Sequence, residues 1–328
     1  MLRQYLRVAD IARSSTHTTS LFSTHHTNLF DSDTEIAIVH ASRDDDLLAQ
    51  HLDTATLTSS PTATTFRTKS VVSSNWSINN NPNGGFSMAM CISAARNVQS
   101  FRDHLTATCH YHSALQEGVP ALFQTHILKQ GKQMSTVNVG VYQQGKQKIN
   151  FVGTFGDLNA LTGVSREEED EDNVTKPIHT MSDFEDCTDT LWTGLNHLNV
   201  GTLYSNGVKV WVPKTSPFLQ TLMVGKAKGE PRIEAWVEFL DGRDPCLRSL
   251  ALFNDCLPPA VLNYAGLSAW VPTIEYTVHS YRRPVPGPMK LSFRADVIQN
   301  GIATVNGEVQ DSQGNLCSVS RQMCTIRV

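Results

Sequence analysis

Two polar side chains lie in apolar stretches in the last third of the chain. Asp255 lies within the apolar run from Leu250 to Leu257, where a carboxylate is costly unless it is partnered. On the expected last strand, Gln322 shares a face with Cys324, Ile326 and Val328. A carboxylate can act as a general base or accept a hydrogen bond from water, and an amide can orient that water. These residue types are therefore candidates for acid–base and hydrogen-bonding chemistry.

Each side chain also has a purely structural explanation. Asp255 precedes Pro258 and Pro259, so it can cap a helical segment that begins there, because proline is tolerated in a first turn. Gln322 can make a buried structural hydrogen bond. The residues alone leave both explanations open.

Other motifs indicate less. Cys109-His-Tyr-His112 contains metal-ligand types, but strand alternation puts His110 and His112 on one face and Cys109 on the other. The sequence has no Gly-x-Ser-x-Gly elbow, no Walker loop and no dinucleotide fingerprint. We therefore expect no metal site and no organic cofactor.

The composition is that of a soluble globular protein. The 328 residues include 27 basic and 31 acidic side chains, for a net charge of -4, which indicates no nucleic-acid partner. No apolar run is long enough to span a bilayer, so we expect no membrane span. The 7 cysteines contain no Cys-x-x-Cys pair, which favours free thiols in a reducing compartment.

The N-terminus has a different composition. Residues 1–30 carry Arg3, Arg7 and Arg13 against one acid, Asp10, and are rich in Ser and Thr. This composition is typical of a mitochondrial transit peptide, but a disordered tail has it as well. We predict a flexible extension over residues 1–50 with a possible targeting role, and a mitochondrial or cytoplasmic location.

The elements that must position the candidate residues come in two similar sets. A turn at residues 82–86 leads into a predicted helix over 87–98. Strands are predicted over 104–113, 121–129, 134–142 and 148–155. Six consecutive acids, Glu167 to Asp172, predict a solvated linker over 160–195, with an acidic docking site as the alternative.

The second set follows the linker. Strands over 209–212 and 232–240 precede a helix from 247 to about 263 and strands over 273–281, 289–299, 302–311 and 316–328. Thr106–Ser113 aligns with Thr273–Ser280, and Ser135–Asn138 aligns with Ala303–Asn306 at nearly the same separation. We predict a duplicated α+β fold, a double hotdog, with one long helix and a four-strand antiparallel meander in each of residues 51–159 and 196–328.

Five segments resemble acyl-CoA thioesterase II-like proteins, and the resemblance covers roughly residues 66–328 apart from the acidic linker. They are Asn81–Phe86, Arg232–Gly242, Leu250–Asp255, Pro272–His279 and Cys317–Gln322. The resemblance implies an enzyme that hydrolyses an acyl thioester of CoA or of a carrier protein. It also implies that Asp255, Thr273 and Gln322 hold and activate a water against the thioester carbonyl.

The first half lacks such a set. Its predicted helix contains no acid, Gly153 stands roughly where the repeat places Gln322, and Thr106 matches Thr273 without partners. One working site per chain is therefore expected, in the C-terminal half. The start of the first helix, at Gly84, Gly85 and Phe86, is the predicted oxyanion and substrate-binding segment, because backbone N–H groups at a helix start suit an oxyanion.

Two other functions stay open on the same scaffold. Hotdog proteins of this kind also dehydrate, isomerise or cyclise a bound acyl or polyketide-like intermediate, and a non-catalytic acyl-binding protein is a third possibility. Two hotdogs in one chain already mimic the usual dimer, so either a monomer or a homo-oligomer fits.

Overall fold

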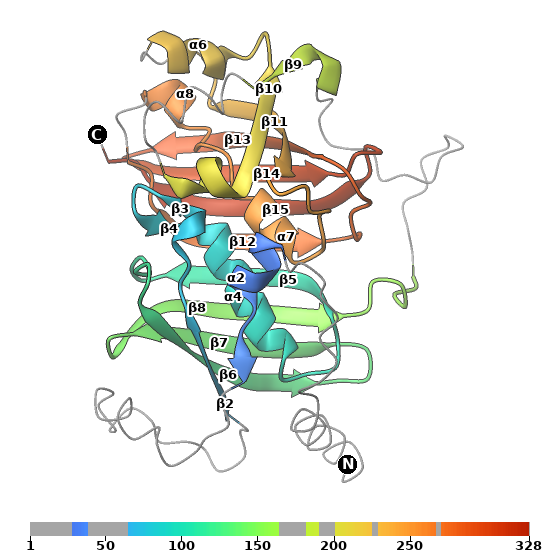
Figure 1. Cartoon of the computed structure of the whole chain (residues 1–328). Coiled ribbons are helices and arrows are strands. Elements are labelled where there is room, and N and C mark those ends of the chain that lie inside the picture. Colours follow the sequence, from blue (N-terminus) through green and yellow to red (C-terminus); the bar gives the residue numbers. More distant parts are fainter. Residues whose placement is uncertain are drawn as a thin grey trace.

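A single curved antiparallel sheet forms the body of the molecule in the computed structural model (Figure 1). The structure describes residues 28–38, 65–163, 182–189, 201–224, 229–266 and 270–327. Within this part the sheet has 13 strands in the order β1-β2-β6-β7-β8-β5-β12-β15-β14-β13-β11-β10-β9. Their bounds are β1 (Ala37–Ile38), β2 (Thr65–Val71), β5 (Asp103–Tyr111), β6 (Pro120–Gln130), β7 (Ser135–Gln143), β8 (Lys146–Gly156), β9 (Cys187–Thr188), β10 (Val208–Pro213), β11 (Arg232–Phe239), β12 (Thr273–Ser280), β13 (Met289–Gln299), β14 (Ile302–Gln310) and β15 (Leu316–Thr325).

The two halves of the sheet meet at β5 and β12. These strands pair antiparallel, with Thr106 opposite His279 and Thr108 opposite Thr277. The two threonine hydroxyls are 2.9 Å apart, so the same residue type lies on both sides of the junction. The arrangement is the predicted double hotdog, and the predicted strands are confirmed over both halves.

The strand connection within each half differs from the prediction. A four-strand meander would pair β5 with β6, but β5 pairs with β8, and β12 likewise pairs with β15. Only the last three strands of each half run as consecutive hairpins. As a result the first strand after each helix lies at the centre of the sheet, where it joins the other half.

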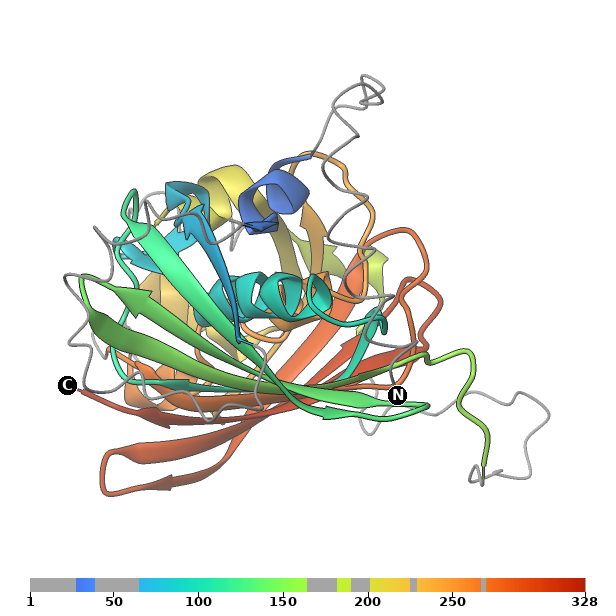
Figure 2. The same ribbon diagram turned by 90° about the horizontal axis from the view of Figure 1, so that it is seen from below.

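Helix α4 (Gly84–Arg96) lies in the concave face of the sheet (Figure 2). Asn83 caps it, since its side-chain oxygen accepts the Phe86 N–H at 2.9 Å. The helix is buried on all sides from Gly85 to Ala95, which its small Ala, Ser and Gly residues permit. It is the first long helix that the sequence predicted, beginning three residues earlier.

The prediction of a second long helix, from 247 to about 263, is wrong. Helix α7 (Ser249–Phe253) ends after five residues, and α8 (Leu262–Ala265) is a separate four-residue helix. Pro258 and Pro259 lie between them, and a proline has no N–H for a continuing helix. The break leaves Asp255 in a non-helical segment at the end of α7.

The predicted flexible extension is too long. Residues 28–38 belong to the folded body, where Leu29–Thr34 form helix α2. Phe30 is fully buried against Trp76 and Phe239, with ring centroids 5.4 Å and 5.1 Å away. Asp31 accepts hydrogen bonds from the guanidinium of Arg243 at 2.7 and 3.0 Å. Of residues 1–30, whose composition suggested a targeting role, positions 1–27 lie outside the described residues, so the targeting prediction stays a prediction.

Part of the predicted linker is also structured. Strand β9 adds to the edge of the sheet beside β10, and Phe184 packs edge-on against Trp211 and Trp236. The acidic run Glu167–Asp172 lies outside the described residues. Among the described residues, no helix is long and apolar enough to cross a membrane.

Phe30→Ala should lower the free energy of unfolding by about 3–5 kcal/mol, because it empties a closed aromatic site shared by both halves. Chemical denaturation measures the loss. Ser32→Ala, on the exposed face of the same helix, is the matched control and should change stability little. Equal stability of the two variants would contradict the packing of α2.

Candidate active site

The carboxylate of Asp255 lies where the two halves touch. It comes from the second half, yet its donors on one side come from the start of α4 in the first half. The Gly85 N–H donates to Oδ2 at 2.8 Å, and the Asn83 amide donates to Oδ2 at 3.1 Å. The same Asn83 amide also donates to the Asp255 backbone carbonyl at 2.8 Å. A helix start is a favourable place for a carboxylate, because free N–H groups point outward there.

The two glycines are required by this close approach. A Cβ on Gly85 would lie 2.3 Å from the Ala251 carbonyl oxygen, and a Cβ on Gly84 would lie 2.9 Å from Asp255 Oδ2. Both separations are too short for any side chain. The Gly-Gly start therefore allows α4 to pack directly onto α7 and onto the carboxylate.

On its other side, Asp255 binds Gln322. The Gln322 side-chain N–H donates to Asp255 Oδ1 at 2.5 Å, from the central strand β15. The structure thus brings together the two polar residues that stood out in apolar stretches. Capping of a following helix does not explain Asp255, because its carboxylate accepts donors from α4 and β15 instead.

Burial raises the pKa of the Asp255 carboxyl to about 6, although the donors from Gln322, Gly85, Asn83 and Gly84 pull it down. Removal from water disfavours the charged form more strongly than these hydrogen bonds favour it. The group is therefore mostly ionised at neutral pH but close to its titration midpoint, which suits a general base.

Asp255, Thr273 and Gln322 line one cavity of about 690 Å³. Thr273 begins β12 beside Cys324 of β15, and within the described part of the chain its hydroxyl makes no hydrogen bond. The cavity wall is otherwise largely apolar. Its apolar residues include Tyr204, Phe218, Leu257, Leu262, Val271, Ile274, Phe293 and Val305.

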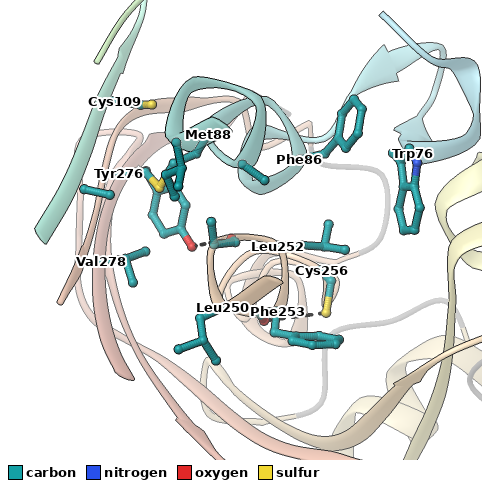
Figure 3. Close-up of a cluster of buried hydrophobic side chains, with 14 of the residues drawn as sticks. Trp76, Phe86, Met88, Cys109, Leu250, Leu252, Phe253, Cys256, Tyr276 and Val278 are labelled. Atoms are coloured by element: carbon teal, nitrogen blue, oxygen red, sulfur yellow. Dashed lines mark hydrogen bonds between the residues drawn. The ribbon is translucent and has the colours of Figure 1, made fainter. Parts of the chain in front are cut away.

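The hydrogen bonds do not support the predicted oxyanion segment. The amides of Gly84 and Gly85 are directed at Asp255, so they already hold a carboxylate. Phe86 is fully buried, stacks on Trp76 with ring centroids 5.8 Å apart, and is not among the residues that line the cavity (Figure 3). The start of α4 positions the carboxylate, and Phe86 is a core residue.

Two further residues of the site were missed. Asn83 was assigned only to a turn, although an Asn directly before a Gly-Gly helix start is a recognisable cap. Tyr111 also lines the cavity, and its hydroxyl donates to the Gly84 carbonyl at 2.8 Å. Its sequence signal was obscured, because it lies between the two histidines of the apparent metal motif.

That metal motif divides between the faces of β5 as expected. Cys109 is buried, His110 is exposed, and the next residue, Tyr111, turns back towards the cavity. In the part of the chain that is described, no three His, Cys, Asp or Glu side chains are grouped to hold a metal ion.

The first-half counterpart of Thr273 differs from the prediction. β12 has a register shift between Thr273 and Glu275, and β5 has the same shift between His104 and Thr106. When the two bulges are superimposed, the residue of the first half that is equivalent to Thr273 is His104, not Thr106.

Comparison with known families identifies both halves of the chain. The sequence profile of the acyl-CoA thioesterase N-terminal domain matches residues 72–156, and that of the acyl-CoA thioesterase C-terminal domain matches residues 185–326. A search of curated proteins gave no match.

Solved structures share the fold. A provisionally named thioesterase II from Thermobifida fusca YX has a TM-score of 0.71 and 20% identity, covering 93% of this chain and 100% of that one. A hot dog fold protein of unknown function from Alicyclobacillus acidocaldarius has a TM-score of 0.67 and 15% identity, covering 92% and 99%.

An acyl-CoA thioesterase II from Mycobacterium marinum is more distant, with a TM-score of 0.58 and 11% identity over 91% of this chain and 98% of that one. At these identities the structural likeness concerns the fold, while the two sequence profiles together span most of the chain. The chain therefore belongs to the acyl-CoA thioesterase family, whose members are thioester hydrolases.

Proposed function

We propose that this protein hydrolyses an acyl thioester with Asp255 as general base and with Gln322 and Thr273 as the groups that position the water. One observation carries the assignment: Gln322 donates to the buried Asp255 carboxylate on the wall of a cavity that Thr273 also lines. Oδ1 of Asp255 accepts from Gln322, and each carboxylate oxygen has two acceptor sites. We assign the attacking water to the second site of Oδ1, because Asp255 lines the cavity.

The chemistry balances without a cofactor. Asp255 takes a proton from the water while the water oxygen forms a bond to the thioester carbonyl carbon. When the tetrahedral intermediate collapses, the carbon–sulfur bond breaks, and the proton on Asp255 passes to the leaving thiolate. The products are a carboxylic acid and a free thiol, and Asp255 returns to its ionised form.

The helix start in the first half sets the position of the base. Gly85 and Asn83 hold Oδ2, while Gln322 holds Oδ1, so the carboxylate plane is determined by both halves of the chain. A base that is fixed in this way needs little reorganisation to reach the reactive geometry. Tyr111, which lines the cavity, donates its hydroxyl proton to the Gly84 carbonyl at 2.8 Å and so helps to fix this helix start.

The cavity suits an acyl substrate. Its volume of about 690 Å³ falls within the usual range for small-molecule sites, and its wall is mostly apolar. We propose CoA or an acyl carrier protein as the thiol. Release of free thiol separates hydrolysis from dehydration and isomerisation, which leave the thioester intact. A free carboxylic acid as the second product separates it from cyclisation through the thioester carbonyl.

Asp255→Asn and Gln322→Ala should each lower kcat by about a hundredfold or more, because they remove the base and the group that orients it. Thiol release from acyl-CoAs of short, medium, long and aromatic chains measures the loss. Asp244→Asn, an exposed carboxylate in the same half, is the matched control and should keep full activity. Retained turnover in both site variants would reject the assignment.

The value of kcat/KM should rise with pH until it levels off above about 6, because the base acts only when it is ionised and burial raises its pKa to about 6. Below that midpoint the rate should fall about tenfold per pH unit. A pH profile of the free enzyme measures the limb. A midpoint near 4 would mean that the essential carboxylate is solvated and is not Asp255.

Asp255→Asn should also stabilise the fold at neutral pH, by roughly 2–4 °C or more in melting temperature. A carboxyl with a raised folded-state pKa binds its proton more tightly when folded, so stability is lost as the pH rises from the ordinary pKa of 3.8 through about 6 and stays lower above it. The difference between variant and wild type should shrink as the pH falls from 7 to 4. An equal or lower melting temperature of the variant at pH 7 would contradict the buried charge.

A further inference from the structure

The mouth of the cavity carries one permanent cation. Most lining residues are apolar or neutral, and a small set is exposed at the surface: Asn79, His112, Ser113, Ala114, Trp270, Ile274 and Arg327. Arg327 is the only Lys or Arg among the described residues that line this cavity. The mouth therefore combines a guanidinium with an indole, Trp270, whose surface is 39% exposed.

Arg327 and Trp270 are held as neighbours. The Trp270 N–H donates to the Arg327 carbonyl at 2.8 Å, and the Arg327 N–H donates to the Trp270 carbonyl at 2.9 Å. Two residues that exchange both backbone hydrogen bonds in an antiparallel pair project their side chains to the same face. Both side chains therefore stand on the same side of this short bridge, and both line the cavity.

Among the described residues, no carboxylate occupies the guanidinium of Arg327, which leaves it available to a ligand. Other partly buried arginines of the fold are used in ion pairs, as Arg243 and Arg248 are with Asp31. Within the described ranges, Arg327 has no ion-pair partner. The one carboxylate that lines the cavity, Asp255, is already held by Gln322, Gly85 and Asn83.

The distance from the reacting group fits a long polar arm. Gln322 lies on β15, and Arg327 lies five residues later, just beyond the end of that strand. At the ordinary strand rise their backbones are about 16 Å apart. An extended pantetheine arm, which separates a thioester sulfur from a phosphate, spans a comparable length. A thioester held at Gln322 thus places the phosphate end of its carrier at the mouth, beside Arg327.

We propose that Arg327 and Trp270 form a subsite for the phosphate-bearing end of the thiol carrier, an inference that rests on the proposed function. A planar guanidinium binds phosphate oxygens in a bidentate manner. The exposed indole offers a stacking face for the adenine of CoA. In this arrangement Arg327 recognises the phosphate that CoA and a carrier-protein arm share, and Trp270 adds recognition of CoA alone.

The test uses one acyl group on three thiols: CoA, 4′-phosphopantetheine and phosphate-free pantetheine. Arg327→Ala should raise KM about tenfold or more for the two phosphorylated thioesters and leave KM for acyl-pantetheine and all kcat values unchanged. Arg327→Lys should recover part of the loss, because it restores the charge without the planar fork. Trp270→Ala should raise KM for acyl-CoA alone.

Arg321→Ala is the matched control, since Arg321 is exposed on the same strand but does not line the cavity. It should change none of the three KM values. An equal effect of Arg327→Ala on all three thioesters, or no effect on any, would overturn the subsite. An equal effect of Trp270→Ala on acyl-CoA and acyl-phosphopantetheine would remove adenine stacking from the proposal.

Binding of free CoA separates this subsite from the hydrolysis itself. If the wild-type protein releases no thiol from any of the three thioesters, the proposed function fails. Titration calorimetry with CoA then decides the subsite alone: about tenfold weaker binding by the Arg327→Ala variant supports it, and equal binding rejects it.

Discussion

The contact between the start of α4 and the Asp255 carboxylate is the constraint on which the rest of the site depends. It joins the two halves of the chain at one charged group, with Gly85 and Asn83 on one side and Gln322 on the other. A buried carboxylate is tolerated only when its lone pairs are matched by donors. The helix start provides such donors in a fixed direction, and glycine at both positions lets the backbone come close enough.

The short second helix makes this contact possible. Helix α7 lies against α4, and the Tyr276 hydroxyl donates to its Ala251 carbonyl at 2.8 Å (Figure 3). If α7 continued past Phe253, Asp255 would have a helical backbone and a direction set by the helix. Because the chain leaves the helix at Asn254, the carboxylate turns between α4 and β15. A regular hotdog helix in the second half is thus replaced by a segment that presents the base.

The sequence was informative where the signal is local. Strand alternation and turn glycines such as Gly145 and Gly314, both with positive φ, define the hairpins of each half. The pairing of β5 with β8 was missed, since alternation does not specify a partner. Helix α2 was missed because six residues show no period, and its anchor Arg243 lies far along the chain. Asp255 and Gln322 stood out as polar residues in apolar runs, but the hydrogen bond between them and the one from Asn83 to Asp255 become visible only in three dimensions.

Duplication produced two helix-and-sheet halves, and the described residues explain why a second copy of this site is absent from the first. His104 occupies the place of Thr273, where it is 1% exposed, and burial lowers the pKa of its imidazole to about 3, so it stays neutral. Gly153 occupies the place of Gln322, and the rings of Phe151 and Phe155 fill the space that a side chain would need, 2.6 Å and 3.0 Å from an added Cβ. The first half therefore has no side chain equivalent to Gln322 and no space for one beside Gly153. The first half contributes to the single site in another way. The start of its helix α4 holds Asp255, the base that the second half supplies.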